Sequence, residues 1–583
     1  MTDGFEVHGR DGAARLGELR LADPVTTPAL VDDVVTDAGS LWRRERDPPS
    51  GDRATLTVLP HRAFPAGTRP EVQEAFDPDP APSAVEGPTA AVVTPETAAD
   101  LGADAYVLST ARGIAGHAEA VVEAVLAVRR AVPPDTALYA PGVATPRAVA
   151  TLAYAGVDLF DAKLARVRGR QGRYLTAEGD YDLDDLAELP GRHPGDPPRD
   201  AFDREAAVAH NVAALAAELA TVRTRIRRGR LRDYVEGQAR HEGWLTAVVR
   251  ELDQEWGYVE RRTPVIRDAE MTAASEDTLQ RVEIRRFADR VTSRYRGRFD
   301  GPLVLVPCSA RKPYGDSRSH RQFRDAIDYR GHRVSMTSPI GVVPQELELT
   351  YPAQHYDSVV TGRWTAGERE FVAEVLRRYL DRTDYDRVVA HVPPGGYRDI
   401  CEAVAADADV PFEYTVGDHP TTDASLSDLR AALSGESRYR KRERQVRTLR
   451  AVADYQFGDG AGDALFDEPR VTGRHPQLQA RDGDEQLAAL VPRYGTLALT
   501  LAGARRALDR SVPIGRATID DFVPHGSVLA PGVVDADDGL RVGDEVVVEG
   551  PGALAVGRAA MSGPEMAASS RGVAVSVRHV AER

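Results

Sequence analysis

The sequence is short of lysine, of cysteine and of long apolar runs, and each shortage narrows the interpretation. Only Lys163, Lys312 and Lys441 occur in 583 residues, and arginine supplies the other basic side chains. Cys308 and Cys401 are too few for a disulfide framework, which predicts a reducing, cytoplasmic setting. No run of eighteen apolar residues occurs, so we expect no membrane-spanning helix. The first residues show no basic region followed by an apolar core, so we expect no signal peptide.

Acidic residues outnumber basic ones, and the formal net charge is -16. In an ordinary cytosol this acidity argues against nucleic acid as a partner. Acidity with scarce lysine also fits a protein that works in molar salt, because the Debye length there falls to about 3 Å and self-repulsion is screened. The same screening weakens phosphate binding through counterion release, so an RNA-binding protein in such a cell would recognise shape. The charge therefore does not exclude RNA.

The pattern of apolar runs predicts an α/β chain of several domains. Residues 1–261 alternate strand-like runs such as AYVLST with alanine-rich stretches, which favours a parallel sheet covered by helices, in the form of a TIM barrel. A charged helical connector is expected at 262–298. Residues 299–446 begin with GPLVLVPCSARKPY and later read VVAHVPPGGYRDICEAVAA, a pattern typical of a second, doubly wound α/β domain with ligands at the carboxyl ends of its strands. Residues 447–513 predict a small α+β module, and residues 514–583 predict a compact β-barrel.

Several of these segments resemble archaeal tRNA-guanine transglycosylases. The runs HGSVLAPGVV, GDEVVV and RGVAVSVRHV resemble a PUA domain, an RNA-binding pseudobarrel, and Gly532 and Arg571 within it are predicted tRNA contacts. The segment from YQFGDGAG to LTLAGARRAL resembles the small domain that precedes PUA in that family. The run YAGVDLFDAKLARVRGRQGRYLT resembles the barrel strand with the nucleophilic aspartate, which would be Asp161. AHNVAALAAELATVRTRIRRGRL resembles the helix after the family's zinc site, with His210 as the histidine ligand.

The barrel departs from that family where its chemistry lies. Three closely spaced cysteines are expected before the histidine, whereas this chain reads ELPGRHPGD. Tetrahedral zinc takes four ligands, and His193 with His210 cannot supply them, so we expect a lost zinc site and no tightly bound cofactor. The stretch with the family's second catalytic aspartate is also not recognisable, and base exchange needs both a nucleophile and an acid/base partner. We interpret the barrel as degenerate, with Asp161 in either a substrate-binding or a purely structural position.

The run PCSARKPYGDSRSH, residues 307–320, is similar to the signature of the archaeosine synthase family, a group of transglycosylase paralogues. The resemblance implies action on tRNA in which guanine at D-loop position 15 has been replaced by 7-cyano-7-deazaguanine. It further implies that an amine, free L-lysine, adds to the nitrile as co-substrate, and that a radical-SAM partner protein cleaves the adduct to archaeosine. Together with the composition it predicts a halophilic archaeal source. A homodimer is a further expectation.

The chemistry of a nitrile suggests parts for the signature residues. Cys308 is the predicted nucleophile, because a thiolate that adds to the nitrile carbon gives a thioimidate that an amine displaces. Neighbouring cations favour a thiolate, and Arg311, Lys312 and His320 are the candidates. Tyr314 or His320 would supply the proton for the imide nitrogen. The predicted catalytic set is Cys308, Lys312, Tyr314, Ser317 and His320, and the predicted ligands for the substrate's ammonium group are Asp316 and Glu346.

Plainer interpretations of the same residues stay open. A cysteine at a strand end is often a small buried side chain, Lys312 could contact a tRNA phosphate, and His320 could be structural. The run RYRKRERQVRTLR, residues 438–450, predicts an RNA-facing basic helix or a solvated charged face. Its predicted tRNA contacts, here called the basic quartet, are Arg438, Arg440, Lys441 and Arg442. Two other functions also stay open: an active transglycosylase that exchanges guanine for the cyano base, and a non-catalytic subunit that presents tRNA.

Overall fold

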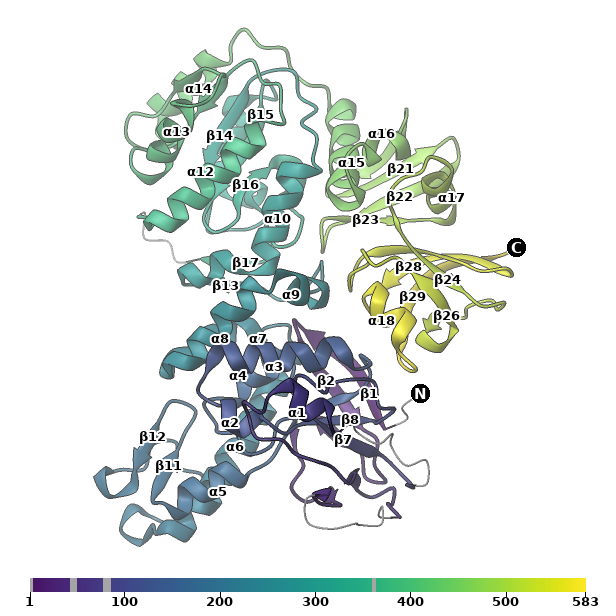
Figure 1. The fold of residues 1–583 in the computed structure, drawn as a ribbon. Helices are drawn as coiled ribbons and strands as arrows, with labels where there is room; N and C mark the ends of the chain where they lie inside the picture. Colours follow the sequence, from purple (N-terminus) through teal and green to yellow (C-terminus); the bar gives the residue numbers. More distant parts are fainter. Residues whose placement is uncertain (1–3, 42–49, 77–84, 359–362) are drawn as a thin grey trace. The chain divides into compact units, whose positions relative to one another are not determined.

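The computed structural model describes residues 4–41, 50–76, 85–358 and 363–583, and the chain divides into two compact units (Figure 1). The first unit comprises Met1–Pro264 with the short segments Leu529–Gly532 and Pro564–Ala574, and the second comprises the rest. Within the described ranges, no helix is both long and apolar enough to cross a membrane.

A curled parallel sheet forms the core of the first unit. The order of its seven strands is β4-β10-β9-β8-β7-β6-β5. The edge strands β4 and β5 are joined by residues 31–34 alone, and hydrogen bonding continues at both ends of this segment: Val31 N donates to Phe160 O, and Leu56 N donates to Val34 O. Because so short a segment spans at most about 14 Å, the two edges lie close together and the sheet is barrel-like. The strands are β4 (Ala29–Leu30), β5 (Val35–Asp37), β6 (Leu56–Val58), β7 (Thr89–Val93), β8 (Ala105–Leu108), β9 (Ala137–Tyr139) and β10 (Leu159–Phe160).

Helices and two small antiparallel sheets complete this unit. The longest helix, α6, begins after Asp203, whose side chain accepts a hydrogen bond from Ala206 N at 2.9 Å and so caps the first turn. The helices are α1 (Pro70–Glu74), α2 (Ala111–Ile114), α3 (Ala118–Ala131), α4 (Val149–Ala155), α5 (Lys163–Arg170), α6 (Arg204–Arg227), α7 (Leu231–Gln238), α8 (Gly243–Gln254) and α9 (Trp256–Arg262). The remaining strands are β1 (Phe5–Asp11), β2 (Ala14–Leu19), β3 (Val25–Thr27), β11 (Arg173–Leu175) and β12 (Asp180–Asp182).

The second unit is centred on a five-stranded sheet of the doubly wound type. The order is β16-β15-β14-β18-β19, and all neighbours are parallel except the edge strand β16. Alternate side chains of β14 point to opposite faces: Val304 and Val306 pack with α11 and α14, while Leu303 and Leu305 pack with α10, α12 and α13. The strands are β14 (Leu303–Pro307), β15 (His332–Thr337), β16 (Gly341–Pro344), β18 (Val388–Ala390) and β19 (Phe412–Tyr414). The helices are α10 (Val282–Ser293), α11 (Arg318–Ile327), α12 (Ala366–Leu380), α13 (Gly396–Ala405) and α14 (Asp423–Ala432).

Two further sheets follow along the chain, drawn in green and yellow in Figure 1. The first is antiparallel, β20 (Arg470–Arg474), β21 (Gln477–Asp482), β22 (Glu485–Val491) and β23 (Thr496–Leu499), with helices α15 (Lys441–Phe457), α16 (Ala461–Leu465) and α17 (Leu501–Asp509). The second has the order β25-β29-β28-β27-β24-β26. Its elements are β24 (Gly515–Ile519), β25 (Ser527–Leu529), β26 (Val533–Ala536), β27 (Glu545–Glu549), β28 (Ala553–Ala559), α18 (Gly563–Ala568) and β29 (Val573–Glu582).

The predicted fold class, a multidomain α/β chain with a C-terminal β-barrel, is confirmed. One predicted segment differs from the expectation. Residues 262–298 are more than a helical connector, because they also contain strand β13 (Met271–Ala273), which pairs in parallel with β17 (Tyr356–Ser358). This pairing joins the segment to the second unit, and it places Tyr356 beside the signature run.

Candidate active site

Cys308 lies at the carboxyl end of β14, where a doubly wound sheet places its ligands. Its backbone N donates to Met336 O at 3.1 Å, and its half-buried Sγ lies 3.3 Å from the hydroxyl of Tyr397. Tyr397 is the second residue of α13, directly after the turn at Gly395, whose φ of 92° favours glycine. The ring of Trp364 packs on Tyr397 with 4.6 Å between centroids. Two strand ends of the sheet therefore meet at the thiol.

Tyr397 is a hydrogen-bond donor suited to this thiol. Burial, and then the nearby sulfur of Cys308, raise the pKa of Tyr397 well above its ordinary value, so the phenol keeps its proton at any physiological pH. A protonated phenol 3.3 Å from sulfur can stabilise a thiolate and can later pass a proton to a nitrogen bonded to the same carbon. Sequence reasoning missed this residue, although the PPGGY turn was visible.

Lys312 lies close enough to Cys308 for the two side chains to interact electrostatically. Its ammonium group sits 3.8 Å from the centroid of the Tyr356 ring, a cation–π contact. Burial lowers the pKa of Lys312, while the charges of Cys308, Asp357 and Glu270 act to raise it. The predicted pairing of Lys312 with Cys308 therefore has a physical basis. Asp357 and Glu270 were not identified from the sequence, because only the β13–β17 pairing brings them here.

Tyr314, Ser317 and His320 make structural contacts around the site, and the hydrogen bond that the described residues give the Cys308 sulfur comes from Tyr397. The Tyr314 hydroxyl is 2.6 Å from that of Tyr356, which is 2.7 Å from Thr337 Oγ1. Ser317 Oγ accepts from His320 N at 3.2 Å and so caps α11. His320 is fully buried, and its Nε2 lies 3.0 Å from Pro307 O. Burial lowers its pKa to about 3, so His320 is neutral, and it ties α11 to the end of β14.

The two predicted acidic ligands do not come together at the thiol. Asp316 is exposed at the end of a short 3-10 turn. Glu346 is 5% exposed, and its Oε2 lies 2.9 Å from His332 Nε2. Since Leu303 pairs with His332 while Pro307 pairs with Met336, Glu346 is at the opposite end of the sheet from Cys308. The expectation that Glu346 binds substrate next to Cys308 is corrected by this strand direction. Burial alone would raise the pKa of Glu346, but the imidazole of His332 lowers it, and this marks a buried structural ion pair.

In the first unit, Asp161 lies at the carboxyl end of β10 and is 1% exposed. Its carboxylate accepts from the Tyr139 hydroxyl at 2.7 Å, from Gly142 N at 3.1 Å and from Lys163 N at 3.1 Å. The ammonium of Lys163 adds an ion pair at 3.2 Å. Contacts from Tyr139, Gly142 and Lys163 thus hold this carboxylate in place.

At the position of the family's zinc histidine, both ring nitrogens of His210 already have protein partners. Nδ1 is 2.7 Å from Asp196 Oδ2 and Nε2 is 3.1 Å from Leu175 O. The ring is fully buried and stacks on Tyr174 with 3.9 Å between centroids, and His193 packs at 5.1 Å. A metal would have to displace one of these hydrogen bonds. The described residues contain no group of three or more His, Cys, Asp or Glu side chains able to hold a metal ion.

The predicted tRNA contacts lie on three separate elements. The basic quartet is exposed and leads into α15, which begins at Lys441, and Arg438 forms an ion pair with Asp328. Gly532 ends the 3-10 turn after β25 and is half-buried, as is Arg571, which follows α18.

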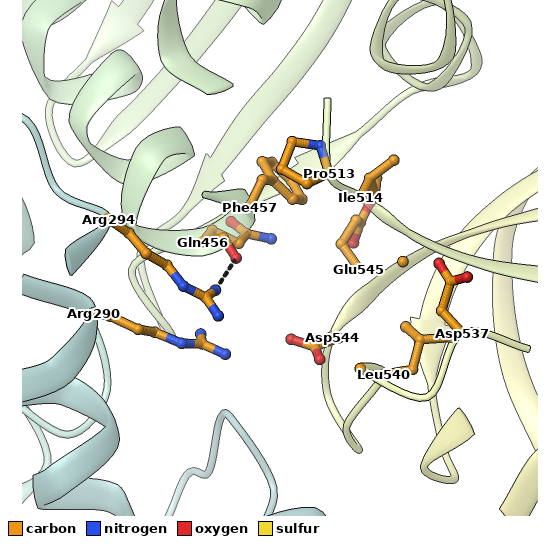
Figure 2. A pocket seen from close by; sticks show the side chains of 12 residues that line it. Arg290, Arg294, Gln456, Phe457, Pro513, Ile514, Asp537, Leu540, Asp544 and Glu545 are labelled. Atoms are coloured by element: carbon orange, nitrogen blue, oxygen red, sulfur yellow. Dashed lines mark hydrogen bonds between the residues drawn. The ribbon is translucent and has the colours of Figure 1, made fainter. Parts of the chain in front are cut away.

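A cavity of about 330 Å³ in the second unit contains no residue of the signature. It is lined by α10, the end of α15 and the C-terminal barrel. Figure 2 shows the guanidinium groups of Arg290 and Arg294 pointing toward the carboxylate of Asp544, and Arg294 donates to Gln456 O at 3.4 Å. This cavity is therefore separate from the predicted site at Cys308.

Sequence profiles of four families match the chain. They are queuine tRNA-ribosyltransferase at residues 93–191, a domain of unknown function (DUF5591) at 284–433, the patch-forming domain C2 of tRNA-guanine transglycosylase at 447–513 and the PUA domain at 516–581. The signature and Tyr397 both fall within the domain of unknown function.

Curated relatives match the chain over most or all of its length. Archaeosine synthase of Haloferax volcanii is 60% identical over 590 residues, with 100% of both chains covered. Archaeosine synthase subunit alpha of Methanosarcina acetivorans is 42% identical, again over 100% of both chains. A tRNA-guanine(15) transglycosylase of Methanothermobacter thermautotrophicus is 28% identical over 79% of this chain and 68% of its own. A crystal structure of a protein of unknown function covers 51% of this chain and 99% of its own, at 32% identity and a TM-score of 0.43. The recognition made from the signature is confirmed: at 60% identity along its whole length, the chain belongs to the archaeosine synthase family.

Proposed function

We propose that this enzyme adds free L-lysine to the nitrile of 7-cyano-7-deazaguanine at position 15 of the tRNA D-loop, on the way to archaeosine. The observation that carries the proposal is the thiol of Cys308 with the Tyr397 hydroxyl at 3.3 Å and the Lys312 ammonium beside it. A nucleophile, a proton donor and a cation are the three aids that amine addition to a nitrile needs.

The reaction is an addition in two stages. The Cys308 thiolate attacks the nitrile carbon and forms a C–S bond, while one π bond of the nitrile becomes a lone pair on nitrogen. The Tyr397 hydroxyl gives that nitrogen its proton, which yields a thioimidate. The neutral ε-amine of lysine then adds to the same carbon, the C–S bond breaks, and the sulfur leaves with its electron pair. The amine's proton returns to Tyr397, and the product is an amidine with no by-product.

Charged side chains around the thiol assist both stages of the reaction. The Lys312 ammonium favours the thiolate, since a nearby cation stabilises the ionised sulfur. Burial disfavours the charged form of Lys312, so an anion beside it, such as the thiolate, stabilises its ammonium group. Asp357 and Glu270, which act on Lys312 electrostatically, are proposed ligands for the α-ammonium group of the substrate lysine. They take the place that sequence reasoning gave to Glu346.

The same proposal covers zinc, the partner proteins and the contacts with tRNA. The enzyme holds no zinc, which the hydrogen bonds on both nitrogens of His210 support. A radical-SAM protein cleaves the lysine adduct, and the chain works as a homodimer. The tRNA is held by the PUA domain and by the basic quartet. No step of the nitrile chemistry uses Asp161.

The test is mass spectrometry of nucleosides from cyano-modified tRNA after incubation with lysine. Cys308→Ala should form no amidine adduct while it still binds tRNA. Cys401→Ala is the matched control, because Cys401 is fully buried and burial raises the pKa of its thiol to about 12. If Cys308→Ala retains near-wild-type turnover, the covalent route is wrong. Release of labelled guanine from unmodified tRNA by the wild type would instead indicate a transglycosylase.

A further inference from the structure

A second cavity of the same unit, here called the tyrosine–arginine pocket, is lined by aromatic rings and arginines. It has a volume of about 250 Å³, and its lining includes Phe299, Tyr329, Tyr439, Arg324, Arg333 and Arg444. The three arginines lie in α11, β15 and α15, and the three aromatic residues lie in the segments just before β14, after α11 and before α15. Cys308, Lys312 and Tyr397 do not line it. The chemistry proposed at Cys308 therefore does not account for the residues that line this pocket.

The lining of the pocket is positively charged, whereas the chain as a whole is acidic. The whole sequence has a net charge of -16. Three arginines line the pocket, and Glu348 is the only carboxylate among its lining residues. Glu348 accepts from Arg333 Nη2 at 3.0 Å and from Gly315 N at 3.1 Å. One acidic group thus faces three guanidinium groups, and the surplus of positive charge favours an anionic ligand.

Two of these guanidinium groups also have a buried Nε–H donor without a hydrogen-bond partner among the described residues. Arg333 is 7% exposed, and its Nε has no hydrogen-bond partner among the residues that the structure describes. The Nε of Arg444 is likewise buried and without such a partner in the described chain. A buried donor left unpaired costs free energy, which an oxyanion in the pocket would recover. Planar guanidinium forks match the oxygens of phosphate in particular.

Tyr329 provides a platform beside these arginines. Its side chain is 38% exposed, although a large aromatic ring usually avoids water. Asp328 and Tyr329 have φ values of 50° and 62°, a left-handed backbone that is rare for residues other than glycine. Tyr439 N donates to Tyr329 O at 2.9 Å and holds this turn, and the Arg444 guanidinium lies 3.5 Å from the Tyr329 ring centroid. Asp328 is the left-handed C-cap of α11, and Tyr329 extends this turn so that its ring lies over Arg444.

We propose that the tyrosine–arginine pocket binds one nucleotide, with its phosphate on Arg333 and Arg444 and its unpaired base against Tyr329. Stacking on aromatic rings combined with arginine contacts to phosphate is how proteins hold single-stranded nucleic acid. A volume of about 250 Å³ is just below the range of roughly 300–1,000 Å³ for small-molecule sites, and it admits one nucleotide but no duplex. The nucleotide is either an unpaired residue of the tRNA or a free nucleoside monophosphate. The first source rests on the proposed function and the second does not.

Calorimetry in molar KCl would test the pocket with AMP, GMP, CMP and UMP, and with inorganic phosphate and the nucleosides as partial ligands. A labelled, unmodified tRNA transcript would be titrated in parallel by fluorescence anisotropy. The monophosphates should bind more tightly than either partial ligand. Arg444→Gln and Tyr329→Asn should each weaken binding about tenfold. Asparagine tolerates the left-handed backbone, so the second variant removes the ring and keeps the turn.

The matched control is Arg430→Gln, because Arg430 is an exposed arginine on α14 of the same sheet domain and outside the pocket. It should change binding less than twofold. Loss of both monophosphate and tRNA binding supports an unpaired tRNA nucleotide as the occupant, and loss of monophosphate binding alone supports a free nucleotide. If both pocket variants bind every probe within twofold of the wild type, the proposal is overturned. These titrations contain neither cyano base nor lysine, so their outcome is independent of the adduct assay on Cys308.

Discussion

Replacing Tyr397 by phenylalanine tests the geometry of the active site most directly. The change removes one oxygen, 3.3 Å from the Cys308 sulfur, and keeps the ring that packs on Trp364. A hydrogen bond to a charged group contributes about 1.5–3 kcal/mol. At about 1.4 kcal/mol per factor of ten, loss of thiolate stabilisation alone should slow adduct formation about 10- to 100-fold.

The size of the loss in rate distinguishes two roles for this hydroxyl, thiolate stabilisation alone or proton donation as well. If Tyr397 also protonates the imide nitrogen, the loss of general acid catalysis adds a factor of about 10²–10⁴. The assay is single-turnover formation of the amidine adduct on cyano-modified tRNA at saturating lysine, followed by mass spectrometry. The affinity for tRNA and the melting temperature should stay at wild-type values, because the packing of the ring is unchanged.

Tyr414→Phe is the control, since Tyr414 is a partly buried tyrosine in β19 of the same sheet, and its ring contact with Arg398 is kept. It should react at the wild-type rate. A rate for Tyr397→Phe within about twofold of the wild type would refute the assignment of Tyr397 as the proton donor. An equal loss in both variants would show that any lost phenol disturbs the sheet.

Four other outcomes are expected. Burial raises the pKa of Glu218 from 4.5 to about 7, so ionisation of this carboxyl lowers the free energy of unfolding as pH rises through that window. Glu218→Gln should therefore raise the free energy of unfolding, measured in urea, by about 3 kcal/mol at pH 8 and hardly at all at pH 4. Lys312→Met should slow adduct formation at least tenfold without loss of tRNA affinity, and an unchanged rate would remove Lys312 from the mechanism. Elemental analysis should find no stoichiometric zinc, and one tightly bound zinc per chain would show that the partners of His210 are displaced. Deleting residues 514–583 should weaken tRNA binding severely even in molar KCl, whereas neutralising the basic quartet should matter most at low salt; the opposite pattern in a salt series would place the main tRNA site on α15.

The sequence predicted the position of the Cys308 thiol more directly than it predicted the contacts around it. The apolar run of β14 followed by the signature placed Cys308 at a strand end, because strand and loop chemistry are local properties of the chain. The same local reasoning gave Ser317 and His320 catalytic parts. In the fold Ser317 Oγ caps α11 through His320 N, and His320 Nε2 contacts Pro307 O, so both residues have structural contacts that local sequence reasoning did not predict.

Glu346 shows the limit of sequence proximity. It follows β16, a short distance along the chain from the signature, yet it pairs with His332 at the amino end of the parallel strands. The end of a sheet at which a residue lies depends on strand order and direction, and the residues next to it in the sequence predict neither. Asp357 and Glu270 were missed for the same reason, because the pairing of β13 with β17 joins segments far apart in the chain.

The sequence by itself determined the family, and it predicted the order of the domains and Cys308 as the nucleophile, since each depends on residue types at fixed spacing in one segment. The tertiary structure decided which groups surround that nucleophile. Tyr397 lies 89 residues from Cys308, and only the adjacency of β14 and β18 brings its hydroxyl to the sulfur. Reactivity at a thiol depends on charges and donors within a few ångströms, and such distances between remote segments arise only when the sheet is assembled.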